Sequence, residues 1–448
     1  GMAANNMVSM ITSIIIGFIV PAFLDLKQYS ILKTYSLFVS YIGLFPLGFV
    51  DGVYIRYGGK NEKEIEKGIF KYEHNFLLIF QMLLMLIILT VSFFLKDNIL
   101  VFFSLTILPF SMIGFLKLYY QAVAAFNKFA VIDISYSLLL FVCNILLVTF
   151  NMKHAITYVI LNVVVYYLVY LAIELNYYKK YKNVKIKKET SVIINNFKVG
   201  IFILIGNLSS VLFYSIDRWF VKIFLPFEDF AFYSFAISMM GLINGIINSI
   251  SVPFYSFFSR ELRKGNNESM HGLLNKLLIL GTLASGGFFV FAFVINLFMQ
   301  KYIPSLKIIS ILFAGFPAII IINVIYINLY KALNQERKYF YKVLLMLVIS
   351  IVINIVALLL KKNIFSISIA TTLSYYIWLF HSQRDFPGIR INLKQITFLV
   401  SYLVIFFIST IELNWVAGFF VYYLALGVLL FKFFREDTLL FVKRIINN

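Results

Sequence analysis

Long apolar runs follow one another along the whole chain, and short polar stretches separate them. A bilayer core about 30 Å thick takes roughly 20 helical residues to cross, and about 14 of the runs reach that length. The pattern therefore predicts an all-α polytopic membrane protein with about 14 transmembrane helices. The expected spans are residues 7–24, 35–55, 76–95, 99–126, 129–150, 155–175, 199–225, 230–258, 273–299, 306–330, 341–360, 363–381, 396–412 and 415–434.

The composition agrees with this pattern and excludes a soluble protein. Of the 448 residues, 61% are hydrophobic and 13% are charged, and the mean hydropathy is +0.90. Soluble domains contain only about 45–50% apolar residues. Residues 1–24 contain no Lys or Arg, so the basic start of a secretory signal is missing and we expect the first run to be retained as a helix.

The basic residues indicate how the chain is oriented. Lys and Arg number 39 against 20 Asp and Glu, which gives a net charge of +19. If the loops alternate between two faces, 27 of the 39 basic residues lie on the side of the termini and 8 on the opposite side. Cytoplasmic loops are enriched in Lys and Arg, so both termini are predicted to be cytoplasmic. Most of the charge is then topology signal and contact with anionic membrane lipids, and no nucleic-acid partner is expected.

A weak internal repeat divides the chain. The stretch Phe23–Tyr29, which follows the first run, resembles Phe224–Phe230 after the seventh, although chance similarity between apolar helices would give the same match. Duplicated helix bundles are common in transporters. The repeat predicts two six-helix bundles around a central cavity, with two additional helices at the end. The expected parts are residues 1–178, a basic cytoplasmic linker at 179–198, a second bundle at 199–381, and two helices with a cytoplasmic tail at 382–448.

Ionisable residues inside apolar spans are costly and usually face a bundle interior or an aqueous cavity. Asp51 and Arg56 are five residues apart, about 140° around a helix, so each requires its own partner. The position of Arg56 equally suits a cytoplasmic anchor at a helix that ends at Gly58 and Gly59. Lys117 and Asp133 lie in consecutive spans, where a mutual ion pair and a functional role explain them equally well.

The seventh span carries the densest group of charges. Asp217, Arg218 and Lys222 occur together, and the two cations are four residues apart on one helical face. Two cations on one face repel each other unless an anion lies between them, which points to an anionic ligand. The alternative is that both side chains extend towards the outer surface.

The sequence gives little support for an enzyme. The four histidines, His74, His154, His271 and His381, lie far apart and lack the paired spacing of a helical metal site. Outward loops are expected to be short, the longest covering about ten residues at 25–34, which leaves little room for the acidic external loop of a membrane glycosyltransferase. We therefore expect a membrane protein that is not an enzyme and has no metal and no cofactor.

Several stretches resemble the Wzx-type polysaccharide flippases of the multidrug/oligosaccharidyl-lipid/polysaccharide exporter superfamily. They are Gln28-Tyr29-Ser30, the segment from Gly43 to Gly48, the segment from Gly48 to Gly59, and Ile216-Asp217-Arg218. Specific similarity covers about 40 residues, while span number and two-part layout agree over the whole chain. Ser30 stands where the family commonly has glycine, and the family's basic N-terminal tail is absent.

The resemblance implies a function and a place in the cell. Such a flippase would move an undecaprenyl-diphosphate-linked oligosaccharide, an O-antigen, capsule or exopolysaccharide repeat unit, from the cytoplasmic to the outer leaflet of the bacterial cytoplasmic membrane by alternating access. It implies a cationic cavity at Arg56 and Arg218, to which the span charges add Lys117 and Lys222. Its partners would be the polyprenyl-diphosphate-linked glycan, membrane lipids and other polysaccharide-assembly proteins.

The span charges also bear on ion coupling and on two competing classes of protein. The carboxylates Asp51, Asp133 and Asp217 are candidates for binding a coupling ion, H⁺ or Na⁺, or for forming ion pairs. A related multidrug or organic-cation exporter would need an acidic or aromatic cavity, which the cations on the seventh span disfavour. A non-transporting scaffold of a polysaccharide synthesis complex predicts that the span charges are dispensable.

Overall fold

The structure is a computed structural model, and it describes residues 2–264, 268–333 and 335–446. Within these ranges the chain folds into helices, and no strand occurs among the described residues. Contacts divide the chain into two units, the first ending at Leu212 and the second beginning at Phe213. Side chains are described except at residues 1–10, 207, 209, 250, 252–253, 255–257, 259–271, 334, 336 and 436–448.

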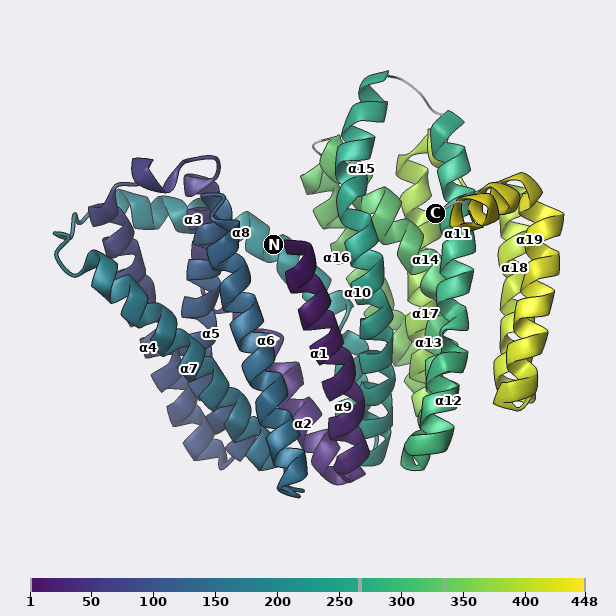
Figure 1. Cartoon of the computed structure of the whole chain (residues 1–448), viewed down its shortest axis with the longest axis horizontal. Helices are drawn as coiled ribbons and strands as arrows, with labels where there is room; N and C mark the ends of the chain where they lie inside the picture. The colour runs from purple at the N-terminus through teal and green to yellow at the C-terminus, as the bar shows by residue number, and fades with distance from the viewer. Residues whose placement is uncertain (1, 265–267, 334, 447–448) are drawn as a thin grey trace. The chain divides into compact units, whose positions relative to one another are not determined.

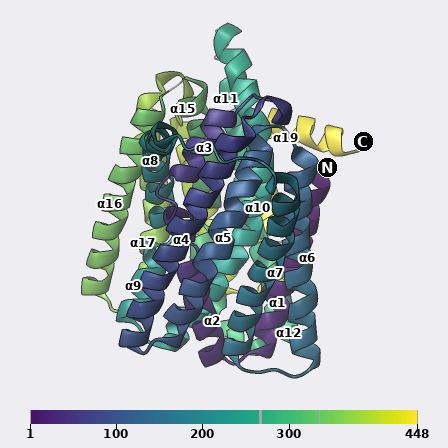
Figure 2. The ribbon, with the colours of Figure 1, turned by 90° about the vertical axis from the view of Figure 1, so that its left-hand side faces the viewer.

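Within the described residues the first unit contains eight α-helices, the last of which ends one residue beyond the boundary (Figure 1). They are α1 (Met2–Phe23), α2 (Leu26–Val39), α3 (Phe49–Tyr57), α4 (Lys67–Leu95), α5 (Asn98–Ala122), α6 (Phe126–Thr149), α7 (Ala155–Tyr181) and α8 (Thr190–Phe213). Figure 2 faces this unit and shows the long helices α4, α5 and α7 running side by side.

The second unit is built from eleven α-helices and two π-helical segments within the described residues. The helices are α9 (Ile216–Phe224), α10 (Phe227–Lys264), α11 (Glu268–Gly286), α12 (Phe288–Phe298), α13 (Ile303–Phe313), α14 (Phe316–Ile321), α15 (Ile327–Ala332), α16 (Glu336–Leu360), α17 (Ile364–Ser382), α18 (Leu393–Phe407) and α19 (Trp415–Ile446). The π-helical segments are η4 (Ile322–Tyr326) and η7 (Ile408–Glu412). Helix α10 packs against α13 and α15, α17 packs between α13 and α16, and the α18–α19 pair lies against α11 and α12.

These helices confirm an all-α, multi-pass membrane protein. Eleven described helices are long and apolar enough to cross a membrane, and the number rises to 13 if each of two bent pairs forms one span. A shorter apolar helical segment at Ile11–Phe23 belongs to α1. Each of the roughly 14 apolar runs of the sequence falls on a helix, so the expected count agrees with the structure.

Several expected boundaries were wrong. The turn expected at residues 25–34 is mostly helix, because the Asp25 carboxylate accepts the Gln28 N–H at 2.7 Å and caps α2. The second span is not one helix: α2 and the short helix η1 (Ile42–Leu44) meet α3 at a bend of 52°. Pro46 lies in this break, where Leu47 and Gly48 adopt positive φ angles of 50° and 80°. The seventh span also breaks, between the end of α8 and the start of α9.

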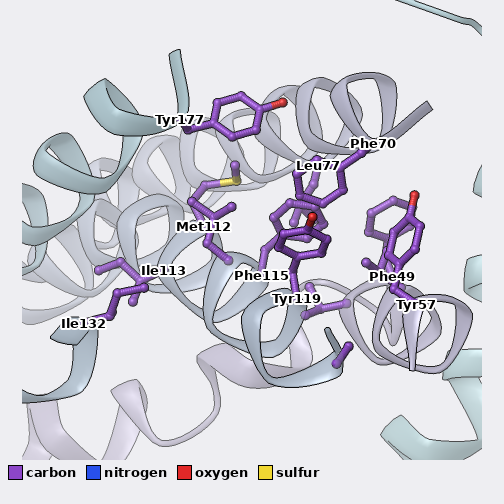
Figure 3. Packing of buried hydrophobic residues seen from close by; sticks show 14 of the residues in the cluster. Phe49, Tyr57, Phe70, Leu77, Met112, Ile113, Phe115, Tyr119, Ile132 and Tyr177 are labelled. Carbon is purple, nitrogen blue, oxygen red and sulfur yellow. The ribbon is translucent and has the colours of Figure 1, made fainter. Parts of the chain in front are cut away.

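An aromatic cluster fills the core of the first unit (Figure 3). The ring of Phe70 on α4 stacks on Tyr119 of α5 with centroids 4.1 Å apart and on Phe115 at 5.5 Å. Tyr57 from α3 meets Phe70 and Tyr119 edge-on at 5.9 and 5.8 Å. All four rings are buried, and they fix α3 against α4 and α5.

The basic linker is attached to the first unit. Helix α7 continues to Tyr181 and α8 begins at Thr190, so the non-helical part is shorter than the predicted 179–198. The Lys71 ammonium on α4 donates to the carbonyls of Tyr181 at 2.8 Å, Lys182 at 3.3 Å and Val184 at 2.9 Å. Three carbonyl contacts from one ammonium hold the linker backbone on α4.

The carboxylate of Glu62 links the loop between α3 and α4 to two neighbouring helices. Glu62, in the loop between α3 and α4, accepts hydrogen bonds from Lys128 at 2.8 Å and from Lys180. Partial burial alone would raise the pKa of Glu62, but these two ammonium groups hold it below its ordinary value. The contact joins the ends of α6 and α7 to the loop.

Helices α3 and α8 approach each other so closely that their glycines are required. A Cβ atom on Gly200 would overlap the carbonyl of Gly48, and one on Gly52 would overlap the carbonyl of Asn196. This contact places the first half of α8 with the first unit, beyond the predicted linker. The division into parts 1–178, 179–198, 199–381 and 382–448, and the internal repeat behind it, stay a prediction.

Candidate functional site

A buried carboxylate lies at the start of α9. Asp217 has an exposed fraction of only 3%. One of its oxygens accepts the hydroxyl of Tyr233 from α10 at 2.5 Å and the hydroxyl of Thr371 from α17 at 3.3 Å. The other oxygen accepts the backbone N–H of Arg218 at 2.7 Å. Both oxygens are therefore satisfied by neutral donors, which is what a carboxylate removed from water requires.

The guanidinium of Arg218 is left with hydrogen-bonding capacity. Its Nε is buried and has no hydrogen-bond partner among the described residues, although the guanidinium charge acts on the adjacent Asp217 carboxylate. An unpartnered buried donor on a cation is costly unless a ligand or water supplies an acceptor. The Nε of Arg218 is therefore available to an anionic ligand, and the role of this residue in substrate binding stays a prediction.

Lys222 lies on the next turn of α9. Its ammonium is 5.3 Å from the centroid of the Phe230 ring at the start of α10, a cation–π distance. The four-residue spacing places it on the same helical face as Arg218, as the sequence predicted. The helix therefore carries two cations over two turns, one beside a buried carboxylate and one against an aromatic ring.

Arg56 is in a different environment. Its Nε lies 3.9 Å from a carboxylate oxygen of Glu73 on α4, a side chain with no exposed surface. Glu73 also accepts the hydroxyl of Tyr57 and the amide of Asn196 on α8, the latter at 2.7 Å. The guanidinium thus offsets a buried charge that joins α3, α4 and α8. Asp51, the other charge of this segment, has no ion pair within the described ranges.

Lys117 and Asp133 form the ion pair that the sequence allowed, between α5 and α6. They line a cavity of about 430 Å³, together with Phe129, Tyr136 and Tyr166. The Lys117 ammonium lies 5.0 Å from the centroid of the Phe129 ring. Because Asp133 already occupies it, Lys117 is less available to a ligand than Arg218.

A double-mutant cycle separates the two roles of this pair. We expect Lys117→Gln or Asp133→Asn alone to lower the thermal unfolding midpoint of the purified protein, because each leaves an unpaired charge. The double variant should recover most of the loss, with a coupling free energy of roughly 1–3 kcal/mol. If the single losses simply add, the pair does not stabilise the fold, and a ligand-binding role for Lys117 gains support.

Several charged groups were not predicted as functional. Glu73 and His74 were placed in a loop, because the apolar run begins only at residue 76, but α4 begins at Lys67. His74 Nε2 lies 3.1 Å from Glu174 of α7, and its ring stacks on Tyr177 with centroids 3.8 Å apart. Both residues could have been found by extending the helix predicted at residues 76–95 a few turns towards its N-terminus.

A third group lies in the second unit. Lys342, which has an exposed fraction of 7%, is 2.8 Å from Asp385 and 2.6 Å from His381 Nδ1. Lys338 contacts the same carboxylate at 3.2 Å, and Tyr330 donates its hydroxyl to it. From the sequence, these lysines were counted only as basic residues of the cytoplasmic face. Their four-residue spacing, which places them on one face of α16, could have indicated a shared partner. Among the described residues, no three His, Cys, Asp or Glu side chains are placed to hold a metal ion.

Comparison with known proteins gives a fold. No family model matches the chain, and no curated protein matches its sequence. Among solved structures, the chain is similar to lipid II flippase MurJ in its inward closed conformation, with a TM-score of 0.69. The match covers 97% of this chain and 98% of that chain at 16% sequence identity. The chain therefore has a MurJ-like flippase fold over nearly its whole length.

Proposed function

We propose that this chain is a transporter that moves a polyprenyl-diphosphate-linked oligosaccharide across a bacterial cytoplasmic membrane by alternating access. The observation that carries the proposal is the guanidinium of Arg218, whose buried Nε has no hydrogen-bond partner among the described residues, in a fold similar to that of lipid II flippase MurJ. A lipid-linked diphosphate needs such a cation, because it brings negative charge into a region of low dielectric. The O-antigen, capsule or exopolysaccharide repeat unit is the glycan class that the Wzx resemblance suggests.

The physical task is to move an anionic, polar head group while its lipid tail stays in the bilayer. Arg218 and Lys222 would replace part of the water that solvates the diphosphate. With cytoplasmic termini, outward movement of about two negative charges is favoured by the membrane potential by roughly 4.6 kcal/mol per 100 mV. A coupled H⁺ or Na⁺ would reduce this, and Asp51, Asp133 and Asp217 are the candidate carboxylates to bind it. No cofactor is part of the proposal.

Reconstitution tests the proposal directly. The purified protein in liposomes should move a fluorescent undecaprenyl-diphosphate-linked oligosaccharide, measured as the fraction of label that becomes accessible to an impermeant quencher. Parallel vesicles should contain labelled lipid II or an organic cation such as ethidium. Protein-free vesicles give the background rate. Movement of ethidium alone would support the organic-cation exporter instead, and movement of none of the three would support the scaffold.

A further inference from the structure

A second cavity lies in the second unit, and its lining is apolar except for a few polar groups. It has a volume of about 570 Å³ and lies between α13, α17 and the α18–η7 segment. Two lysines line it, Lys307 from α13 and Lys361 from the turn between α16 and α17, and no acidic residue does. Neither lysine has an ion pair within the described residues. We propose that this cavity binds an anionic membrane phospholipid, a role independent of the transported substrate.

The polar end of the cavity is built for a phosphate group. The Lys307 ammonium lies 4.9 Å from the centroid of the Phe365 ring near the start of α17, and the Lys307 side chain is exposed. Asn363 caps α17, where its Oδ1 accepts both the N–H and the hydroxyl of Ser366 at 2.9 Å. Two ammonium groups beside the N-terminus of a 19-residue helix favour a negative charge there.

The walls of the cavity match a hydrocarbon chain. Ile369, Leu373 and Tyr376 follow one face of α17, and Leu403 and Phe407 face the cavity from α18. From Asn363 to Tyr376 the helix rises roughly 20 Å, which exceeds the depth of about 15 Å of one leaflet's hydrocarbon. The wall hydroxyls are already used, since Thr372 donates to the Ile311 carbonyl at 2.7 Å and Tyr376 to the Ala314 carbonyl at 2.8 Å. The lysines are therefore the groups left for the ligand.

The position of the cavity also agrees with the predicted topology. Both lysines belong to the eight basic residues on the face opposite the termini, which are Lys27, Lys33, Lys96, Lys153, Lys301, Lys307, Lys361 and Lys362. Basic residues are few on that face, so the enrichment of Lys and Arg on the cytoplasmic side does not explain two lysines in one apolar cavity. The bound lipid would then come from the outer leaflet.

Lipid binding to the delipidated full-length protein tests this site. Native mass spectrometry should show one tightly bound phosphatidylglycerol and a clear preference over phosphatidylcholine with the same chains. Lys307→Gln and Lys361→Gln should each weaken phosphatidylglycerol binding about fivefold. The pair Lys96→Gln and Lys153→Gln, which removes the same charge from the same predicted face of the first unit, should leave binding unchanged.

A third variant tests the hydrocarbon part of the site. Leu373→Trp fills the cavity without changing its charge and should weaken binding of both phospholipids. The proposal is overturned if the variant that carries both Lys307→Gln and Lys361→Gln keeps the preference for phosphatidylglycerol. It is also overturned if inorganic phosphate displaces the lipid at equal concentration, because the site would then recognise a free anion.

Discussion

Replacing Gly200 by alanine should abolish most of the folded protein. The new Cβ atom would overlap the backbone carbonyl of Gly48, and backbone atoms cannot move aside as a flexible side chain can. Overpacking of a well-packed core costs about 1–3 kcal/mol, and a clash with backbone on a helix that also carries Asn196 lies at the upper end. Thermal unfolding of the detergent-purified protein should show a large drop in midpoint, with low yield in the membrane.

The same helix offers a matched control. Gly206 lies further along α8, and an added Cβ there meets nothing within 4 Å. Gly206→Ala should therefore leave the unfolding midpoint unchanged or raise it slightly, since alanine favours helix. Equal destabilisation by both substitutions would show that the glycine contact between α3 and α8 is not what holds α8 to the first unit.

The sequence predicted the helical fold well, because crossing a bilayer requires long apolar runs that composition reveals directly. It did not predict where those runs break. Pro46 was visible as a helix breaker, but the break also places Leu47 and Gly48 in left-handed conformations, and Gly48 packs so closely on Gly200 of α8 that no Cβ atom would fit. Breaks of this kind depend on tertiary contacts between segments far apart in sequence.

The candidate site was predicted in part. Asp217, Arg218 and Lys222 are conspicuous because charges inside an apolar run are costly. Sequence spacing also allowed the Lys117–Asp133 pair, which the structure places together. Glu73 was missed because it lies just outside the apolar run, and its partners Arg56 and Asn196, which come from two other helices, could not be read from sequence spacing. The structure thus gives Arg56 a structural partner, whereas Arg218 has none for its Nε among the described residues.

That difference leads to the second strong prediction, which concerns transport. Arg218→Gln removes the charge but keeps a polar, though shorter, side chain that can still donate hydrogen bonds. Because charge-assisted hydrogen bonds contribute about 1.5–3 kcal/mol, we expect the rate of lipid-linked glycan movement in proteoliposomes to fall roughly tenfold or more. The unfolding midpoint should change little, since the neighbouring Asp217 carboxylate keeps its hydrogen bonds from Tyr233, Thr371 and the backbone. Arg218→Lys should retain part of the rate, because it keeps the charge and loses the planar fork.

The control must remove a cation from a span without touching the Asp217 cluster. Lys276→Gln on α11 serves this purpose, because Lys276 is an exposed residue in a membrane-spanning helix. Its rate should equal that of the unmodified protein. Arg56→Gln should behave differently from both, with a lower unfolding midpoint, because it leaves Glu73 buried without its counter-charge. If the Arg218→Gln variant moves the lipid-linked glycan at the normal rate, Arg218 does not bind the diphosphate. The proposed substrate class would then lose its main support.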